Sequence, residues 1–409
     1  MTQIKDRVRA SFLWEPILAL RARGFENRYR RWRDLYEDWL DHHGCRYDES
    51  ACISQVRSRL KDRGYCVSPR PRGQVRTLAL IGECSWHPML LCALGEIGEV
   101  VNCDYVRFGL DRPAPPEKAQ DNRRRFGDHV LEVLKEQSKE RPFDWVFAYV
   151  NGSHIHRELL TRIRDEFGLP TVNMCLDDKN CWSTRQLGGQ DCGQTDLADA
   201  FDLSWTSASV ACGWYLARGG RPIYMPEGCD PSEYHSAAGQ YDIPISFMGA
   251  SYGCRPVVVR YLRRHGLPVK IFGRGWGKSG EFASSPADVF SRSQINLGIG
   301  GISFSEMLTN VKGRDFDVAC TGGGAYLTTF NPDLANAFVV GDEILCYANR
   351  EEAIELAHDY LRRPDDCRAM AQRARARCLR DHRWSDRFWR ICEILGVAPG
   401  GGASARTCV

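Results

Sequence analysis

The chain has 409 residues, 43% of them hydrophobic and 11% aromatic, enough to fill the cores of about two domains. Its 55 basic and 52 acidic residues leave a formal net charge of +3, so the overall charge gives no basis for a nucleic-acid partner and we expect none. The apolar runs are no longer than a strand, far short of the ~20 residues that span a bilayer. Because no secretory cleavage site follows the first residues, we expect a cytoplasmic protein.

The 18 cysteines are spread along the whole chain and do not cluster as in a small disulfide-rich domain. No pair has the C-x-x-C spacing of a zinc or redox site. Cys181 and Cys192 flank a polar loop, but no histidine pair lies near them at ligand spacing. We therefore predict ordinary reduced thiols, no metal site and no cofactor.

Residues 1–75 are rich in arginine and form the first part of the chain with a distinct pattern. Aromatic residues recur at helical spacing, as at Trp32, Tyr36 and Trp39, which predicts two or three amphipathic helices ending near Gly64. Basic and aromatic residues alternate here. The segment is therefore either a packing appendage or a surface for peripheral membrane or protein contact.

Residues 76–240 alternate short apolar runs with longer helical stretches. We predict strands at 77–82, 100–105, 145–150 and 171–176, and helices at 116–140 and 153–167. A segment rich in proline, glycine and other turn residues at 226–241 then indicates a linker.

The alternation of strands and helices restarts at residue 241. We predict strands at 245–249, 269–273, 295–300, 325–330 and 344–348, and helices that include 256–265, 304–310, 313–319 and 385–395. Two such blocks predict two Rossmann-like, doubly wound α/β domains, at 76–240 and 241–396, with a flexible tail at 397–409. Ligands of such sheets bind beyond the carboxyl ends of the strands, so a cleft between two facing domains is the expected site.

The segment from Gly249 to Gly253 reads G-A-S-Y-G and follows a predicted strand. This pattern matches the nucleophile elbow of α/β hydrolases, in which a helix begins directly after the serine. Here Pro256 marks the first helical position, which leaves a loop after Ser251. A serine hydrolase is one interpretation. The other is an anion-binding turn, in which backbone amides, the helix dipole and Arg255 hold a phosphate.

The segment from Gly273 to Gly277 reads G-R-G-W-G and follows the next predicted strand. Its spacing is not the G-x-G-x-x-G of nicotinamide dinucleotide sites, and no acidic residue stands about 20 residues on to bind a ribose. A dinucleotide is therefore disfavoured. Gly275 still permits close approach of a ligand and Arg274 could contact phosphate, although a plain turn explains the glycines equally well.

A third segment, K-G-R-D-F-D from Lys312 to Asp317, opens a predicted helix that leads to the triple glycine at 322–324. Two cations, two carboxylates and three glycines at one strand–helix junction predict a nucleotide site. Lys312 and Arg314 would contact phosphate and a carboxylate would contact ribose hydroxyls. A solvated charged turn is the alternative.

Two polar residues of the first block follow predicted strands. Asp178 ends the strand at 171–176 together with its neighbour Asp177, and His154 lies after the strand at 145–150. Either side chain could face the expected cleft as a general base. The D-x-D spacing of metal-dependent glycosyl transfer is absent, so no metal is required. A polar loop residue and a helix-capping histidine are the alternatives.

Four segments recur together in one known family. They are G-A-S-Y-G-C-R at 249–255, G-R-G-W at 273–276, K-G-R-D-F-D-V-A-C-T-G at 312–322 with L-T-T-F-N-P-D-L at 327–334, and G-D-E-I-L-C-Y at 341–347. In order and spacing, residues 244–395 resemble the CgeB-type family of glycosyltransferases, which is related to group 1 enzymes of the GT-B fold. The first block matches more loosely, from Gly168 to Asp178, and residues 1–75 match nothing in the family.

The resemblance implies a GT-B fold, whose two domains face a cleft and whose final helix, here at 385–395, crosses back to the first domain. It implies a metal-independent, retaining, hexosyltransferase-like enzyme with a nucleotide-diphosphate sugar in the second domain and an unidentified acceptor in the first. Its motifs assign the donor to Gly249, Tyr252, Arg255, Arg274, Gly275, Lys312, Arg314 and Asp317. Asp178 and His154 are the catalytic candidates.

Three departures from the family pattern bear on activity. The family has glutamate where this chain has Asp317, and the first glutamate of the E-x7-E motif of group 1 enzymes is replaced by Thr309. One extra residue also enters the loop at 320–324. These changes imply either a different donor nucleotide or a non-catalytic protein that binds a nucleotide or sugar on the same fold.

Overall fold

The computed structural model describes residues 14–65, 68–83, 87–235, 239–283 and 285–400. The chain divides into two compact units. Among the described residues, the N-terminal domain consists of residues 33–225 and 384–400, and the C-terminal domain consists of residues 14–32 and 226–383. The division thus falls before the predicted boundary at 240, and the turn-rich segment is part of the C-terminal domain.

The N-terminal domain is built on a six-stranded parallel sheet in the order β2-β1-β3-β4-β7-β8. Its strands are β1 Val75–Leu80, β2 Gly98–Asn102, β3 Trp145–Ala148, β4 Thr171–Cys175, β7 Leu203–Thr206 and β8 Pro222–Tyr224. All four strands predicted for 76–176 form. β2 ends earlier than predicted because the Asp104 side chain accepts the Val106 amide and caps a short helix there.

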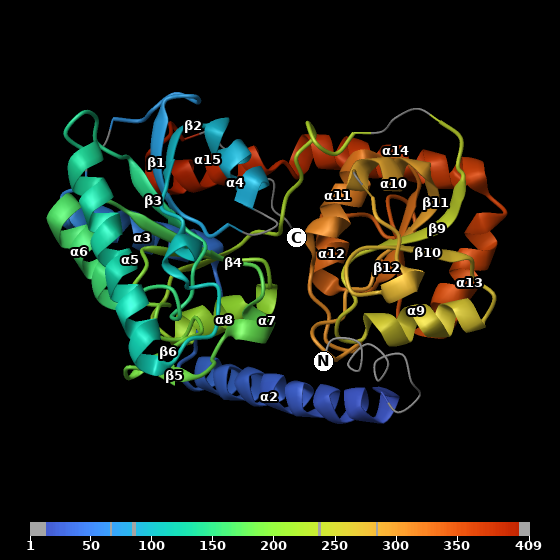
Figure 1. Ribbon diagram of the computed structural model, residues 1–409. Helices are drawn as coiled ribbons and strands as arrows, with labels where there is room; N and C mark the ends of the chain where they lie inside the picture. Colours follow the sequence, from blue (N-terminus) through green and yellow to red (C-terminus); the bar gives the residue numbers. More distant parts are fainter. Residues whose placement is uncertain (1–13, 66–67, 84–86, 236–238, 284, 401–409) are drawn as a thin grey trace. The chain divides into compact units, whose positions relative to one another are not determined.

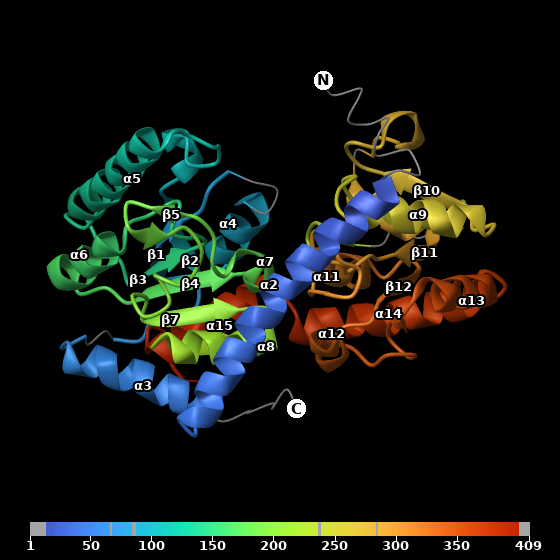
Figure 2. The same cartoon turned by 90° about the horizontal axis from the view of Figure 1, so that it is seen from below.

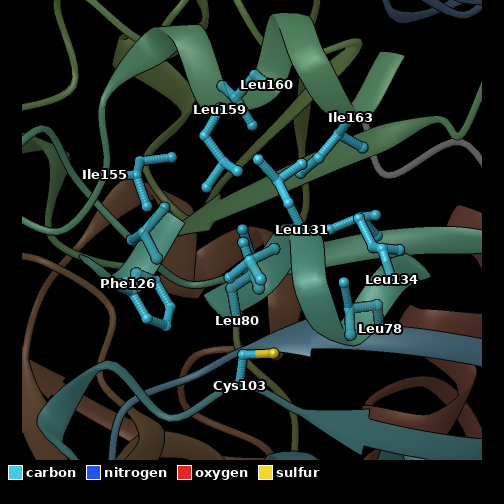
Figure 3. Close-up of a cluster of buried hydrophobic side chains, with 14 of the residues drawn as sticks. Leu78, Leu80, Cys103, Phe126, Leu131, Leu134, Ile155, Leu159, Leu160 and Ile163 are labelled. Carbon is cyan, nitrogen blue, oxygen red and sulfur yellow. The ribbon is translucent and has the colours of Figure 1, made fainter. Parts of the chain in front are cut away.

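Helices cover both faces of this sheet. They are α4 His87–Gly95, η1 Tyr105–Phe108, α5 Pro116–Gln137, α6 Arg157–Phe167, α7 Asp178–Cys181, α8 Ser209–Ala217 and α15 Trp384–Leu395, with a hairpin of β5 Gln186–Leu187 and β6 Gln190–Asp191. Helices α5 and α6 lie on one side of the strands, and α3 (Glu49–Asp62) and α15 lie on the other (Figure 2). Under α5 and α6, side chains such as Leu80, Phe126 and Leu160 form a buried core (Figure 3).

The C-terminal domain has a five-stranded parallel sheet in the order β10-β9-β11-β12-β13. Its strands are β9 Ile243–Met248, β10 Val269–Phe272, β11 Ser293–Leu297, β12 Ala325–Thr329 and β13 Leu345–Tyr347. Its helices are α9 Arg255–Arg264, η2 Gly277–Ser279, α10 Pro286–Arg292, α11 Gly313–Thr321, α12 Pro332–Ala337, α13 Arg350–Leu361 and α14 Pro364–Asp381. Helices α10, α11 and α14 cover one face and α9 and α13 the other (Figure 1).

Both sheets therefore have the doubly wound topology that the sequence predicts. In each, the second strand pairs on one side of the first strand and the third strand on the other. This reversal opens a crevice beyond the carboxyl ends of the first and third strands, which is the usual ligand position in such sheets. The crevice lies at β1 and β3 in the N-terminal domain and at β9 and β11 in the C-terminal domain.

The helix predicted at 304–310 does not form. This segment is a loop in which the Ser305 hydroxyl accepts hydrogen bonds from the Met307 and Leu308 amides, and Gly301 pairs with Thr309 as an isolated bridge. A serine side chain that captures backbone amides competes with helix formation. The result is a shaped loop at the carboxyl end of β11.

The N-terminal extension contains the predicted helices, α2 Trp14–His42 and α3 Glu49–Asp62. Asp48 caps α3 by accepting the Ala51 amide at 3.0 Å. Residues 14–32 of α2 belong to the C-terminal domain and its remaining residues to the N-terminal domain, where the Trp182 indole donates to the Tyr36 hydroxyl at 3.0 Å. The part of the prediction that concerns residues 1–13 lies outside the described residues.

The end of the described chain differs from the flexible tail predicted from residue 397. Val397 and Ala398 are buried, and the Val397 carbonyl accepts the Arg70 amide at 2.7 Å. The final helix, α15, packs on α3 and α4 in the N-terminal domain, so the chain crosses back as the family resemblance implied. Among the described residues, no helix is both long and apolar enough to cross a membrane.

Candidate functional site

Two glycine-rich loops lie side by side at the carboxyl ends of β9 and β10. The Gly249 amide donates to the Phe272 carbonyl at 2.8 Å, and the Ser251 amide donates to the Arg274 carbonyl at 2.8 Å. The Trp276 indole donates to the Gly249 carbonyl at 2.7 Å. These three bonds fix the shape of the loop that follows β9.

Four backbone amides of the loop after β9, which the G-A-S-Y-G pattern offered as anion ligands, already have partners within the protein. The amides of Ser251, Tyr252, Cys254 and Arg255 all donate to backbone carbonyls of the protein. Because these four donors are already used, we expect side chains to supply most of the contacts to an anion here.

The side chains that meet at this loop are Arg255, at the start of α9, and Arg314, in the first turn of α11. Both guanidinium groups lie close to Gly249. A Cβ atom added at this residue would lie 2.7 Å from Arg314 Nη2 and 3.2 Å from Arg255 Nη1. The two guanidinium groups also share one aromatic neighbour, since their Cζ atoms lie 5.3 Å and 5.9 Å from the Phe247 ring centroid. Two cations therefore converge at the carboxyl end of β9, and glycine is needed because any side chain would displace them.

The electrostatics of this pair favour a bound anion. Arg255 Nε and Arg314 Nη1 are buried without a hydrogen-bond partner in the described chain. Burial, followed by the like charge of Arg314, lowers the pKa of the Arg255 guanidinium to about 10. A buried donor without a partner costs free energy, and so do two like charges in proximity. A phosphate group would remove both costs, because guanidinium groups bind it through charge-assisted hydrogen bonds.

The first turn of α11 is held by a carboxylate that the sequence analysis did not single out. Asp315 accepts the Lys312 amide at 2.8 Å and the Tyr326 hydroxyl, and burial raises the pKa of its carboxyl. The spacing of three residues between Lys312 and Asp315 is that of a helix-capping box, which could have identified it. Asp315 thus fixes the start of the helix that carries Arg314.

Asp317 lies two residues further into α11 and is also buried. Its Oδ1 atom has no hydrogen-bond partner among the residues that the structure describes. Burial raises the pKa of the Asp317 carboxyl well above its ordinary value, although the charge of Arg314 and a hydrogen bond with Tyr234 act in the opposite direction. Asp317, the predicted ribose ligand, therefore interacts with Arg314 and has one acceptor atom unused.

The triple glycine is not part of this site. Residues 322–324 follow the C-terminal end of α11, while Lys312 and Arg314 lie at its N-terminal end, and a nine-residue helix separates them by about 14 Å at ~1.5 Å per residue. These glycines serve packing: a Cβ at Gly324 would lie 1.9 Å from the Ser293 carbonyl oxygen. From sequence alone, these glycines and Lys312 are expected at the same strand–helix junction, because the sequence does not give the direction of the helix relative to the sheet.

Three other residues predicted to bind the donor nucleotide sugar lie in the loops after β9 and β10. Tyr252 is 44% exposed, and the Arg255 guanidinium stacks on its ring at 4.2 Å from the centroid. Gly275 has φ +85° and stands against Ser251, whose Cβ would lie 3.3 Å from a Cβ at 275. Arg274 has an exposed side chain, and its described contact is made by its backbone carbonyl.

Ser251 lacks the surroundings of a hydrolase nucleophile. Helix α9 begins at Arg255, after a loop, where a nucleophile elbow requires the helix to begin at once. Of the histidines that could complete a triad, His358 is exposed on α13 and His382 is buried with its Nε2 3.0 Å from the Ala337 carbonyl oxygen. The G-x-S-x-G match is therefore a turn sequence.

His154 lies at the crevice of the N-terminal domain, after β3. Its ring stacks on Tyr105 with centroids 4.1 Å apart, and its Nδ1 accepts the Asn151 amide at 3.0 Å. Burial lowers the pKa of His154 to about 4, so the ring is neutral at pH 7 with its proton on Nε2. In this state the Nε2–H group of His154 is a hydrogen-bond donor.

Asp178 lies at the start of α7 and is fully buried. Its two oxygens accept hydrogen bonds from the Thr206 hydroxyl at 2.5 Å and the Tyr215 hydroxyl at 2.9 Å. Burial raises the pKa of Asp178 to about 6. These contacts tie α7, β7 and α8 together inside the N-terminal domain, and Asp178 and His154 are not joined by a described contact.

The described residues contain no group of three or more histidine, cysteine, aspartate or glutamate side chains that could hold a metal ion. The fold brings cations and carboxyl groups together at the carboxyl ends of β9 and β11. All of these side chains come from the C-terminal domain. This group of charged side chains can bind a phosphorylated ligand.

Comparison with known proteins finds a family match that covers the segment carrying these residues. Residues 255–393, which include Arg255, Arg314 and Asp317, match the family described as glycosyl transferase-like. No curated protein matches the sequence.

Solved structures match most of the chain. Sucrose-phosphate synthase from Thermosynechococcus elongatus has 10% sequence identity and a TM-score of 0.57, over 79% of this chain and 99% of that one. HepE from Anabaena, in complex with UDP and glucose, has 11% identity and a TM-score of 0.51, over 79% of this chain and all of that one. The N-terminal domain of Candida albicans trehalose-6-phosphate phosphatase has 10% identity and a TM-score of 0.50, over 81% and 98%. The chain therefore has the GT-B fold of two Rossmann-like domains, and its C-terminal domain is glycosyl transferase-like in sequence.

Proposed function

We propose that this protein is a glycosyltransferase whose C-terminal domain binds a nucleotide-diphosphate sugar. One observation carries the proposal: the buried Arg255 and the half-buried Arg314 bring their guanidinium groups together at Gly249, at the carboxyl end of β9, and each has one buried nitrogen atom with no hydrogen-bond partner among the described residues. This is where doubly wound sheets bind ligands, and the site needs an anion. The glycosyl transferase-like sequence of residues 255–393 and the UDP and glucose bound by HepE support a nucleotide sugar as that anion.

Each donor residue has a role in this proposal. Arg255 and Arg314 hold the diphosphate, with Lys312 near them at the start of α11, and Asp317 accepts from a ribose hydroxyl through its unused oxygen. In the two loops, Gly249, Tyr252 and Gly275 approach the ligand closely. Arg274 contributes a further cation at the edge of the site.

Catalysis would then consist of stabilising the departing nucleoside diphosphate and positioning the acceptor. Arginine neutralises the negative charge that develops on the leaving phosphate, which is a preorganised electrostatic contribution to the rate that requires no metal. Retention of the anomeric configuration and transfer of a hexose are what the family resemblance implies. Asp178 and His154 stay the candidates for the base, and donor hydrolysis by Asp178→Asn and His154→Gln variants measures their contribution.

The donor site is tested by thermal unfolding with UDP, GDP, ADP and dTDP and with their glucose esters. A ligand at about 100 times its Kd stabilises the folded protein by roughly 2.7 kcal/mol, enough to shift the midpoint by several degrees. We expect one nucleotide to give this shift and the Arg255→Gln and Asp317→Ala variants to reduce it. If no nucleotide and no nucleotide sugar shifts the midpoint, the proposed donor site is wrong.

A second function, binding of a nucleotide sugar without turnover, has one observation in its favour. Both Asp178 oxygens and His154 Nδ1 already accept hydrogen bonds within the protein, so the structure uses both candidate bases internally. Release of the nucleoside diphosphate from the bound donor, measured with and without added sugar acceptors, separates the two functions. Binding with no release over hours would favour the non-catalytic protein.

The N-terminal extension is a further candidate for contact with a membrane or protein partner. On α2, Ile17 is 39% and Leu20 73% exposed, on a helix whose arginines include the exposed Arg23 and Arg31. Apolar residues beside arginines favour an anionic lipid surface. Sedimentation with phosphatidylserine vesicles, compared between the wild type and Leu20→Glu, tests this role. Binding that the substitution leaves unchanged would exclude this face of the helix.

A further inference from the structure

A small pocket of about 150 Å³ lies beside the arginine pair in the C-terminal domain. The loop after β9, the first turn of α9, the loop after β11 and helix α2 each contribute to its wall. It is lined by Arg21, Ser251, Tyr252, Gly253, Pro256, Ser303 and Phe304. One wall therefore comes from the N-terminal extension, which lies outside the segments that resemble a known family.

Two described contacts hold α2 against this pocket. The Arg21 guanidinium lies over the Phe304 ring, with its Cζ atom 5.1 Å from the centroid. The Ser305 hydroxyl donates to the Glu26 carboxylate. Arg21 and Glu26 are five residues apart on one helix and contact adjacent residues of one loop, so the helix and the loop form a defined wall.

The floor of the pocket is held by close backbone packing. A Cβ atom at Gly253 would lie 1.6 Å from the Ser303 carbonyl oxygen, which also accepts the Cys254 amide at 3.2 Å. Among the described residues, Ser303 is the only non-glycine residue with positive φ, at +51°. A residue held in this sparsely populated region shows that the surrounding structure determines the shape of the loop.

Tyr252 joins this pocket to the proposed diphosphate site. Tyr252 lines the pocket, and the Arg255 Cζ atom lies 4.2 Å from the centroid of the Tyr252 ring. Arg314 interacts with both Arg255 and Asp317. Pairwise interactions therefore connect Asp317 to Arg314, Arg314 to Arg255 and Arg255 to Tyr252, and a ligand with its ribose at Asp317 and its diphosphate at the arginines would reach the pocket with its other end.

The lining has the chemistry that recognises a sugar ring. Tyr252 and Phe304 present aromatic surface, against which the C–H face of a sugar packs, and Pro256 adds apolar surface. The Arg21 guanidinium donates hydrogen bonds but accepts none, and the Ser251 and Ser303 hydroxyls can do both, which suits sugar hydroxyl groups.

We propose that this pocket binds a sugar ring and that helix α2, through Arg21, is part of the sugar-binding site. The proposal rests on the proposed function for the position of the nucleotide. The ring belongs either to the donor or to the acceptor, and the experiment distinguishes these sources.

The experiment compares wild type with Arg21→Ala and Phe304→Leu by calorimetry, using the nucleoside diphosphate that stabilises the wild type most and its glucose, galactose, mannose and N-acetylglucosamine esters. Arg23→Ala, two residues away on α2 and exposed, is the control. For a donor sugar, we expect Arg21→Ala to weaken the nucleotide sugar about tenfold and the nucleotide alone by less than twofold. For an acceptor sugar, we expect Arg21→Ala to leave the affinities for the nucleotide and for its sugar ester unchanged. Binding of the methyl glycosides to the nucleotide-loaded protein should be lost.

Two results would overturn the proposal. If Arg21→Ala and Phe304→Leu fold and bind every ligand as the wild type does, the pocket does not bind the sugar; if they weaken the nucleotide as much as its sugar, the pocket serves the nucleotide. Failure of the proposed function is recognised separately, because the wild type would then bind no nucleotide. In that case saturation-transfer NMR with the free methyl glycosides decides: a signal that Arg21→Ala abolishes supports the sugar pocket, and no signal overturns it.

Discussion

Arg255 and Arg314 are brought together over Gly249 although they start different helices, α9 and α11, and are separated by most of a β–α–β–α unit. Burial and the charge of Arg314 lower the pKa of Arg255 to about 10. The protein therefore retains an unfavourable pair of like charges, which is a common cost of a preorganised binding site.

Removing one member of this pair should stabilise the free protein and abolish its response to ligand. We expect Arg255→Met to raise the free energy of unfolding by roughly 1 kcal/mol, because the repulsion between the two guanidinium groups disappears, and the midpoint by about 2–4 °C. The nucleotide-induced shift should be lost. Differential scanning calorimetry measures both, with Arg264→Met on the exposed side of α9 as the control that changes neither. A less stable variant that keeps its ligand response would contradict the anion site.

Gly249→Ala should separate binding from backbone strain. The new Cβ would lie 2.7 Å from Arg314 Nη2 and must displace that guanidinium. We expect nucleotide affinity to fall at least tenfold, with a loss of stability of about 1 kcal/mol from the unfavourable φ. Gly341→Ala is the matched control, because Gly341 also has positive φ, at +87°, but a Cβ added there would meet no described neighbour within 4 Å. Equal loss of affinity in both variants would mean that strain alone is responsible.

Asp178→Asn should remove a pH-dependent part of the stability. Burial raises the pKa of Asp178 from 3.8 to about 6, so the folded protein binds the proton more tightly than the unfolded chain. Its contribution to stability is full below pH 3.8 and is lost as the pH rises through 6. Two pKa units correspond to about 3 kcal/mol, so between about pH 4 and pH 7 the stability of Asp178→Asn relative to wild type should rise by that order.

Denaturant unfolding at several pH values measures this difference, and Asp177→Asn, on the exposed neighbouring residue, is the control. Parallel pH profiles for the wild type and Asp178→Asn would contradict the shifted pKa. Donor hydrolysis by the same variant shows whether the carboxyl also takes part in catalysis.

His154 should remain neutral well into the acidic range. Burial lowers the pKa of His154 from 6.5 to about 4, so its contribution to stability is present above pH 6.5 and is lost as the pH falls through 4. The imidazole carbon resonance of 13C-histidine-labelled protein, assigned with His154→Asn, should titrate near pH 4. If His154 is the base, donor hydrolysis should fall only near this pH. A titration midpoint above pH 6 would contradict the buried, neutral ring.

The order of the elements is largely written in local sequence. The apolar runs at 77–82, 145–150 and 171–176 form β1, β3 and β4, and Pro256 marks the start of α9, because side-chain periodicity and turn chemistry act over a few residues. The loop at 304–310 escaped this reading because a single serine side chain, Ser305, captures the amides that a helix would use.

The tertiary structure alone decided which of these residues meet. The sequence by itself determined the two doubly wound blocks and the charged and glycine-rich segments that carry candidate ligands. It could not pair Arg255 with Arg314, separate the glycines at 322–324 from Lys312, bury Asp178 or bring Arg21 to Phe304. Distances between side chains on different elements depend on strand order and packing across the whole domain, and a pKa depends on burial that only the folded chain creates.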